Sequence, residues 1–364
     1  MFAYLAGHKG SFWRFCLILI VMSIGFMACG KPAATPALTD QPVASIVPGE
    51  TPAPPATETT LPTPTAQPPL AILLATPGAD SAQVALVQPV LSELAAQDGW
   101  RFESRADLPA NAIEEGIMLV VVMMPDPGVA ELAAQYPEIQ FLAAGIPDVP
   151  ASANLSLISP LGDRPDRQGF LAGYLAAVIT QDWRVGVISL PDTPAGMAAR
   201  QGFLNGVVFY CGLCRPVYPP FYQYPLYAEI PAGADQAEQQ AIANTLIESE
   251  VETVYVYPEA GDEGLLAFLA QAGVNIIGGI TPPDGLSDHW VASVYPDWAA
   301  AIRLAWSQLV SGQTGFVLDV PVMLTDRNDA LFSPGRQRLV EKTLTELSDG
   351  FIDTGVDPQT GAPR

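Results

Sequence analysis

Histidine and cysteine are scarce in this sequence, and common catalytic motifs are missing. Only two of the 364 residues are histidines, and one of them, His8, lies in a basic leader. The sequence contains no GxSxG, HExxH, GxxxxGK or GxGxxG pattern. His289 stands beside Trp290 at the start of a predicted strand, where a structural role is expected. We therefore expect no enzyme, no catalytic residue, no metal site and no cofactor.

Basic residues are also scarce. Lysine and arginine number 16 against 38 aspartates and glutamates, which gives a net charge of −22. Residues 1–28 hold two basic and no acidic residues, so the chain from residue 29 onward has 14 basic against 38 acidic residues, or −24. A surface of this charge repels nucleic acid and anionic headgroups. The charge argues against a role in binding either of them.

The apolar run near the N-terminus is short. It extends from Cys16 to Met27, whereas a membrane-spanning helix needs about 20 apolar residues. Small residues flank Cys29, and the segment resembles a bacterial lipoprotein signal, although Phe26 stands where such signals usually carry leucine. The resemblance implies removal of residues 1–28 and lipidation (palmitate) of Cys29, with the protein anchored on the extracytoplasmic face of the cell membrane. The alternative is an uncleaved N-terminal anchor.

Residues 29–69 have the composition of a spacer. Proline, threonine and alanine dominate from Lys31 to Pro69, and aromatic residues are almost absent. Such a segment stays extended and solvated, at up to about 3.1 Å per residue where it is polyproline-like. We expect a disordered tether, with the globular part beginning near Leu70.

Two cysteines remain after the leader and the lipid site, and they form the sequence CGLC. Cys211 and Cys214 follow a predicted helix, so they lack the helix N-terminus that lowers a thiol pKa. Outside the cytoplasm we expect a local disulfide. A CxxC oxidoreductase is the alternative. A zinc site would need two more ligands.

After Leu70, short apolar segments alternate with longer segments of helical spacing. The predicted strands lie at 70–76, 117–125, 139–146, 154–160, 183–191, 253–260, 274–280 and 289–296. The predicted helices lie at 82–97, 127–137, 167–180, 197–208, 235–250, 262–273 and 298–312. Uniformly apolar strands indicate burial on both faces, which favours parallel sheets with right-handed crossovers. The fold class is α/β.

One open sheet rarely holds this many strands, so we predict two lobes with a hinge and a cleft between them. The first lobe would be 70–160 completed by 281–314, and the second 161–280 completed by 315–348. The chain would cross near 158–165, near 280–283 and near Gly315. Residues 349–364 would form a flexible tail. Ligands would gather at the carboxyl ends of the strands, facing the cleft.

The order of these segments resembles the BMP family of basic membrane lipoproteins. The resemblance rests on ELAAQYPEIQFLAAG, SANLSLISP, RQGFLAGYLAAVITQDWRVGVISL, ARQGFLNGV, VETVYVYPEAGDEGLLAFLAQAGVNIIGGI and HWVASVYPDWAAAI, and covers most of residues 70–312. It implies a type I periplasmic binding protein fold and a substrate-binding protein that presents purine nucleosides to an ABC importer.

The residues expected to contact a nucleoside differ from that family's pattern. TPGADSAQ replaces an acidic loop containing serine and asparagine after the first strand. Gly145 or Ile146, and Ile280, stand where aspartates are expected, and Tyr295 and Pro296 stand where a lysine is expected. Unpaired polar groups of a buried ligand cost about 1 to 3 kcal/mol each. The resemblance therefore leaves the identity of the solute open.

Several polar and aromatic residues follow predicted strands and are candidates to bind a ligand. They are Asp80, Asp126, Asp192, Glu259, Asp262, Tyr295 and Trp298, with Tyr257 as a further ring. Carboxylates before helices also serve as N-caps, and aromatic residues there can be lobe packing. The segment YPPFYQYPLY, residues 218–227, is either an edge strand or an exposed partner surface.

These observations predict a monomeric extracytoplasmic lipoprotein that captures a small polar solute for an ABC permease and ATPase. A sensor or surface-interaction module with the same fold is the second reading. The CxxC oxidoreductase is the third.

Overall fold

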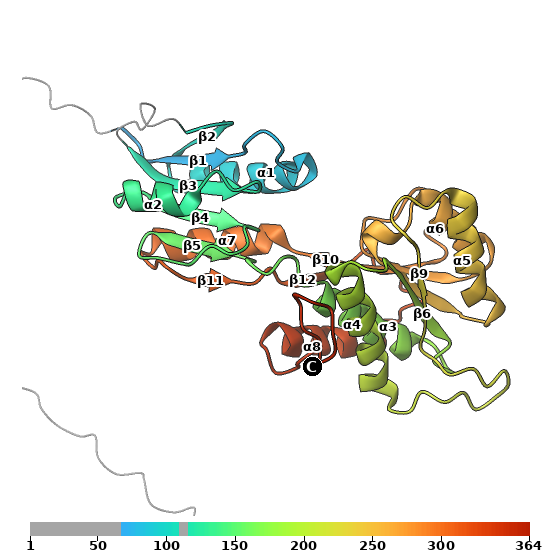
Figure 1. Ribbon diagram of the computed structural model, residues 1–364. Helices are drawn as coiled ribbons and strands as arrows, with labels where there is room; N and C mark the ends of the chain where they lie inside the picture. Colours follow the sequence, from blue (N-terminus) through green and yellow to red (C-terminus); the bar gives the residue numbers. More distant parts are fainter. Residues whose placement is uncertain (1–66, 109–115) are drawn as a thin grey trace, which may run out of the picture. The chain divides into compact units, whose positions relative to one another are not determined.

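The computed structural model describes residues 67–108 and 116–364, all within one compact unit of residues 64–364. The chain forms two six-stranded sheets, each flanked by helices (Figure 1). All of the predicted strands and helices are present, so the predicted α/β class is confirmed. The predicted leader, Cys29 and the tether up to residue 66 lie outside the described residues. None of the described helices has the length and apolarity needed to cross a membrane.

The first sheet is entirely parallel, in the order β11-β5-β4-β3-β1-β2. Its strands are β1 (Leu70–Leu74), β2 (Arg101–Arg105), β3 (Ile117–Met123), β4 (Gln140–Ala144), β5 (Leu155–Ile158) and β11 (Val317–Leu318). Its helices are α1 (Ser81–Gln97), α2 (Val129–Gln135) and α7 (Trp298–Val310). Ala71 and Leu73 pack in one core with α1 and α7, whereas Leu70, Ile72 and Leu74 pack in a second core with α2. Helices therefore cover both faces, as the uniformly apolar strands predict.

The second sheet has the order β12-β10-β9-β8-β6-β7, and only β12 runs antiparallel to its neighbour. Its strands are β6 (Val185–Ser189), β7 (Leu226–Glu229), β8 (Thr253–Val256), β9 (Asn275–Gly278), β10 (Trp290–Pro296) and β12 (Val322–Thr325). Its helices are α3 (Pro165–Ile179), α4 (Pro194–Cys211), α5 (Gln236–Glu248), α6 (Glu263–Gln271), α8 (Pro334–Ser348) and the 3₁₀ turn η2 (Pro258–Ala260).

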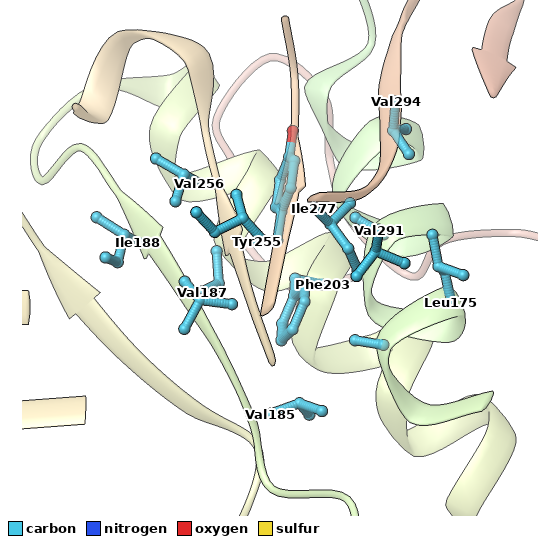
Figure 2. Close-up of a cluster of buried hydrophobic side chains, with 14 of the residues drawn as sticks. Leu175, Val185, Val187, Ile188, Phe203, Tyr255, Val256, Ile277, Val291 and Val294 are labelled. Atoms are coloured by element: carbon cyan, nitrogen blue, oxygen red, sulfur yellow. The ribbon is translucent and has the colours of Figure 1, made fainter. Parts of the chain in front are cut away.

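The core of the second lobe joins α3 and α4 to the central strands. Phe203 of α4 stacks on Tyr255 of β8, with ring centroids 6.2 Å apart and planes 9° apart. Figure 2 shows both rings among Val187, Ile277 and Val291 from three neighbouring strands. All five side chains are fully buried. These contacts fix α3 and α4 against the sheet, and hence the loops that follow its strands.

The chain passes between the two lobes three times, at 159–164, at Asp297 and at 319–321. The prediction that 281–314 completes the first lobe is wrong for its first part, because β10 hydrogen-bonds to β9 and β12 in the second sheet. The second crossing therefore follows Pro296 rather than lying near 280–283. The third follows β11, which pairs with β5, so residues 315–318 belong to the first lobe.

The C-terminal segment is also different from the prediction of a flexible tail. Thr354 is buried, its hydroxyl donates to Asp166 over 2.7 Å, and its carbonyl accepts from Asn205 of α4 over 2.7 Å. Val356 is fully buried and forms a β-bridge with Pro363. Residues 349–364 therefore pack onto the second lobe.

Candidate functional site

A hollow of about 500 Å³ opens at the carboxyl end of β1. The loop after β1 and the first turns of α1 form its walls: Ala75, Thr76, Gly78, Ala79, Ser81, Val84, Ala85, Gln88 and Pro89. The loop turns at Gly78, where φ is +98°, a value that favours glycine. Small side chains keep the space open, and Thr76, Ser81 and Gln88 supply polar groups. Its volume is in the usual range for small-molecule sites.

Neighbouring loops of the first lobe meet beside this hollow. The hydroxyl of Thr76 donates to the carbonyl of Pro125 after β3 over 3.2 Å. Gly145 after β4 has φ +71°, and a Cβ there would lie 3.5 Å from the ring of Trp298 and 3.8 Å from the amide of Gln83. Trp298 is 5% exposed and belongs to the core with α1. These distances are ordinary contacts, so the positive φ rather than lack of space favours glycine at 145.

Three of the predicted carboxylates cap helices or turns. Asp80 accepts from the amide of Ala82 over 2.9 Å at the start of α1, and Asp262 accepts from Leu265 over 3.0 Å at the start of α6. Asp126 accepts from the amides of Gly128 and Val129 over 2.9 and 2.8 Å. These bonds satisfy amide groups that have no helical acceptor. A ligand-binding role for the three residues stays a prediction.

The other two predicted carboxylates are unpaired. Within residues 67–108 and 116–364, neither Asp192 nor Glu259 makes a hydrogen bond or an ion pair. Asp192 follows β6 in a left-handed conformation with φ +55°, and the next residue, Thr193, caps α4 instead. Glu259 lies in η2, directly after β8. Both carboxylates follow carboxyl ends of strands and remain available for a ligand.

Glu259 belongs to an electrostatically coupled group that the sequence did not reveal in full. The pKa of Asp163 is raised, chiefly by desolvation of its carboxyl and further by the charge of Glu259, while the neighbouring side chain of Trp298 lowers it by less. Burial, Glu259 and Asp163 together raise the pKa of Tyr257 far above its ordinary value. Asp163, Tyr257, Glu259 and Trp298 are therefore close enough to interact. The two exposed carboxylates of the group suit cationic or hydroxyl-rich solutes, while its two rings are buried.

Tyr295 lies near the second crossing, three residues before Trp298. Its hydroxyl accepts a hydrogen bond of 3.2 Å from Thr325 of β12, which pairs in the ladder with Ser293, two residues before Tyr295 on β10. Tyr295 is only partly buried. The bond fixes the ring orientation beside the crossing at Asp297, and the predicted stacking of this ring on a solute stays a prediction.

An ion network ties two crossings to the C-terminal segment. Arg164 binds Asp166 through two hydrogen bonds of 2.9 and 2.8 Å. Asp319, at the third crossing, binds Arg164 over 3.2 Å and Arg167 over 3.0 Å. The carboxylate of Asp166 is fully buried and also accepts from Thr354. Sequence reasoning did not single out these residues, although two arginines and an aspartate within four positions are unusual for so acidic a chain.

The two cysteines lie away from these loops. Cys211 ends α4, and the structure pairs it with Cys214, with Cα atoms 5.0 Å apart. Both precede β7, at the amino ends of the second sheet. Cys29 lies outside the described residues. The part of the chain that the structure describes holds no group of three or more histidine, cysteine, aspartate or glutamate residues placed to bind a metal.

Comparison with known proteins identifies the fold. An ABC transporter solute-binding protein from Conexibacter woesei aligns with a TM-score of 0.56 at 19% identity, over 79% of this chain and 98% of that one. A solute-binding protein of an ABC transporter system from Aeropyrum pernix aligns with a TM-score of 0.50 at 15% identity, over 79% and 93%.

A transcriptional activator of the comK gene from Bacillus halodurans aligns with a TM-score of 0.53 at 14% identity, over 81% of this chain and 99% of that one. No protein-family model and no curated protein sequence matches the chain. The type I periplasmic binding protein fold expected from the sequence is confirmed, at sequence identities of 14 to 19%.

Proposed function

We propose that this chain is an extracytoplasmic solute-binding lipoprotein that captures a small polar solute for an ABC importer. The observation that carries the proposal is that open space and unpaired carboxylates both lie at carboxyl ends of strands, the space in the first sheet and the carboxylates in the second. This fold is used by ABC solute-binding proteins, and ligands of open α/β sheets bind at those ends. The hollow at β1 and the free carboxylates of Asp192 and Glu259 all lie there.

The chemistry of these residues favours a cationic or hydroxyl-rich solute. Asp163 and Glu259 are exposed and supply acceptors, while the rings of Tyr257 and Trp298 are buried beside them. The differences from the BMP family at Gly145, Ile280 and Tyr295 argue against a nucleoside held as in that family. The signal-like leader supports lipidation of Cys29, and the Pro/Thr/Ala-rich segment supports a tether.

A thermal-shift screen tests the proposal. The chain is heated with nucleosides, sugars, polyamines and amino acids, and a specific solute should raise the melting temperature as its concentration exceeds Kd. With that solute, Glu259→Gln should lose most of the shift. Glu138→Gln is the matched control, because Glu138 is exposed and lies before β4, at the opposite end of the strands. A panel with no selective compound would argue against solute capture.

A sensor is the second candidate, because the same fold occurs in the comK activator. Genes for a permease and an ATPase beside the gene for this chain would favour import. Their absence, together with a confirmed solute, would favour sensing.

A further inference from the structure

A long part of this acidic chain contains no acidic residue. From Thr193 to Ala228 there is no aspartate or glutamate, although the whole chain has 38. Arg200 and Arg215 are the charged residues of this stretch. It comprises α4, the loop of residues 212–225 and the start of β7. The surface that this stretch forms therefore differs in charge from the rest of the molecule.

The 212–225 loop exposes large apolar side chains. Leu213 is 79% exposed, Val217 68%, Tyr218 67%, Phe221 70% and Tyr222 43%. Exposed apolar groups this dense indicate a contact surface rather than chance exposure. The two half-exposed rings of Phe209 and Tyr210 extend the surface onto the last turn of α4.

Buried anchors hold the loop in place, so its apolar side chains cannot simply turn inward. Cys214 is 3% exposed and paired with Cys211, which ends α4. Tyr224 is 5% exposed, and its hydroxyl donates to the carbonyl of Ser249 over 2.6 Å. Arg184 donates to the carbonyl of Pro219 over 3.2 Å. The interior positions of the loop are filled by these anchors, and the remaining rings point to solvent.

The loop lies at the end of the second sheet opposite to the candidate solute site. It contacts Arg184 before β6 and Ser249 before β8, both at the amino ends of parallel strands. Figure 1 shows it as a long yellow-green excursion beyond the end of α4. Solute bound at the carboxyl ends would not cover it. The surface thus needs an occupant of its own.

We propose that the 212–225 loop docks on the bilayer surface to which the chain is tethered. Tyrosine and phenylalanine suit the membrane interface, where one part of the ring contacts acyl chains and the polar tip stays hydrated. Arg215 is exposed and, within the described residues, makes no hydrogen bond or ion pair, so it is free to contact a headgroup phosphate. Beside the contact of Arg184 with the loop, Asp182, Glu250 and Glu252 lie 2.7 to 3.9 Å from Arg184, whose single positive charge offsets only part of theirs. The remaining negative charge disfavours anionic headgroups, so the docking is proposed for a zwitterionic surface.

A lipid tether would allow weak docking to hold the loop at the membrane. This step rests on the proposed lipid anchor. Residues 29–66 separate Cys29 from the first described residue, a span of roughly 120 Å at most if the segment is polyproline-like. A tethered module experiences an effective concentration in the millimolar range. A few interfacial rings that bind poorly from solution would then hold the second lobe at the membrane.

Vesicle binding without the lipid tests the loop independently of the anchor. The mature chain, residues 29–364 with Cys29→Ser, is titrated with phosphatidylcholine vesicles and bound protein is measured by sedimentation. The double variant Tyr218→Ser/Phe221→Ser should bind at least about tenfold more weakly than this chain. Phe351→Ser is the control. Phe351 is an equally large ring that is 81% exposed, but it belongs to the C-terminal segment after α8 and not to the 212–225 loop.

Equal binding of all three chains, or no binding of the chain with an intact loop, overturns the proposal. An effect of the double variant on self-association, with vesicle binding unchanged, would assign the loop to a second copy and also overturn it. The solute screen on the same preparation separates the two proposals. Solute binding without vesicle binding would remove the docking alone, and vesicle binding without solute binding would remove solute capture alone.

Discussion

Asp166 is the residue on which the ion network depends. Its side chain is fully buried, and it binds the guanidinium of Arg164 and the hydroxyl of Thr354. Burial alone raises its pKa, but the hydrogen bonds and charge of Arg164, the hydrogen bond of Thr354 and the charge of Arg167 lower it further than burial raises it. The native structure therefore stabilises the ionised form.

Replacement of Asp166 should be costly. We expect Asp166→Asn to lower the free energy of unfolding by about 3 kcal/mol, because it leaves a partly buried arginine short of a counter-charge. The control is Asp319→Asn, whose side chain is 38% exposed, and which should cost no more than about 1 kcal/mol. Urea unfolding at neutral pH measures both values. Equal costs would show that the buried position of Asp166 does not matter.

The pH dependence of Asp166 has a definite sign. Because its pKa is lowered in the folded chain, its contribution to stability is fully present above the ordinary aspartate pKa of about 3.9 and is lost as pH falls through the folded pKa. The stability difference between the native sequence and Asp166→Asn should therefore shrink below about pH 4. A difference that stays constant from pH 7 to pH 3 would contradict this assignment.

Asp80 allows the capping and ligand-binding roles to be separated. Asp80→Ala removes the acceptor for the amide of Ala82 and should lower the free energy of unfolding by about 1 kcal/mol. Asp80→Asn keeps an acceptor and should lower it much less. If Asp80 also contacts a cationic solute, Asp80→Asn will weaken solute binding while it leaves stability almost unchanged. Calorimetric unfolding with and without solute distinguishes the two effects.

At single residues, the sequence predicted local interactions better than distant ones. Asp80 and Asp262 precede helices, so their capping bonds follow from neighbouring residues and could be foreseen. The contacts of Asp166 with Thr354 and of Arg164 with Asp319 join positions more than 150 residues apart. No local pattern specifies such partners, which is why this network was missed.

At the scale of elements, α3 and α4 pack with their backbones in direct contact. Gly169 and Gly173 of α3 face Ala199 and Phe203 of α4, and a Cβ at either glycine would lie 2.0 or 2.1 Å from a carbonyl oxygen. Gly202 and Gly206 of α4 approach α3 in the same way. The two backbones touch because no side chain separates them.

Gly173→Ala tests this contact. The added methyl group would meet the backbone oxygen of Phe203, so the helices must separate, and we expect the free energy of unfolding to fall by about 2 to 3 kcal/mol. Gly335→Ala is the control in the first turn of α8, where the nearest heavy atom would be 3.9 Å away. That change should be neutral or should stabilise by up to about 1 kcal/mol. Urea titrations that show equal effects would contradict the close packing.

Element type followed from the sequence, but assignment to a sheet did not in every case. Strongly apolar segments such as Ile117–Met123 were recognisable strands because burial on both faces leaves no polar position. β2 was not predicted, because Arg101, Glu103 and Arg105 make its sequence look like a loop. β10 was predicted as a strand but placed in the wrong lobe. Its apolar pattern fits either sheet, and only its hydrogen bonds to β9 and β12 settle the choice.

At the scale of the whole molecule, the two ends of the strands carry different kinds of side chain. The carboxyl ends carry the hollow, Asp192 and Glu259, whereas the amino ends of the second sheet carry the aromatic 212–225 loop. We propose solute binding at the first set and membrane docking at the second. The two functions can therefore be removed separately by mutation.

The most direct test of solute capture is to identify what the protein carries. The chain is purified from its native host without added ligand, denatured, and the released small molecules are identified and quantified by mass spectrometry. We predict one cationic or hydroxyl-rich compound in near-equimolar amount, greatly reduced in Glu259→Gln and retained in Glu138→Gln. Release of no compound, together with no selective compound in the solute screen, would contradict it.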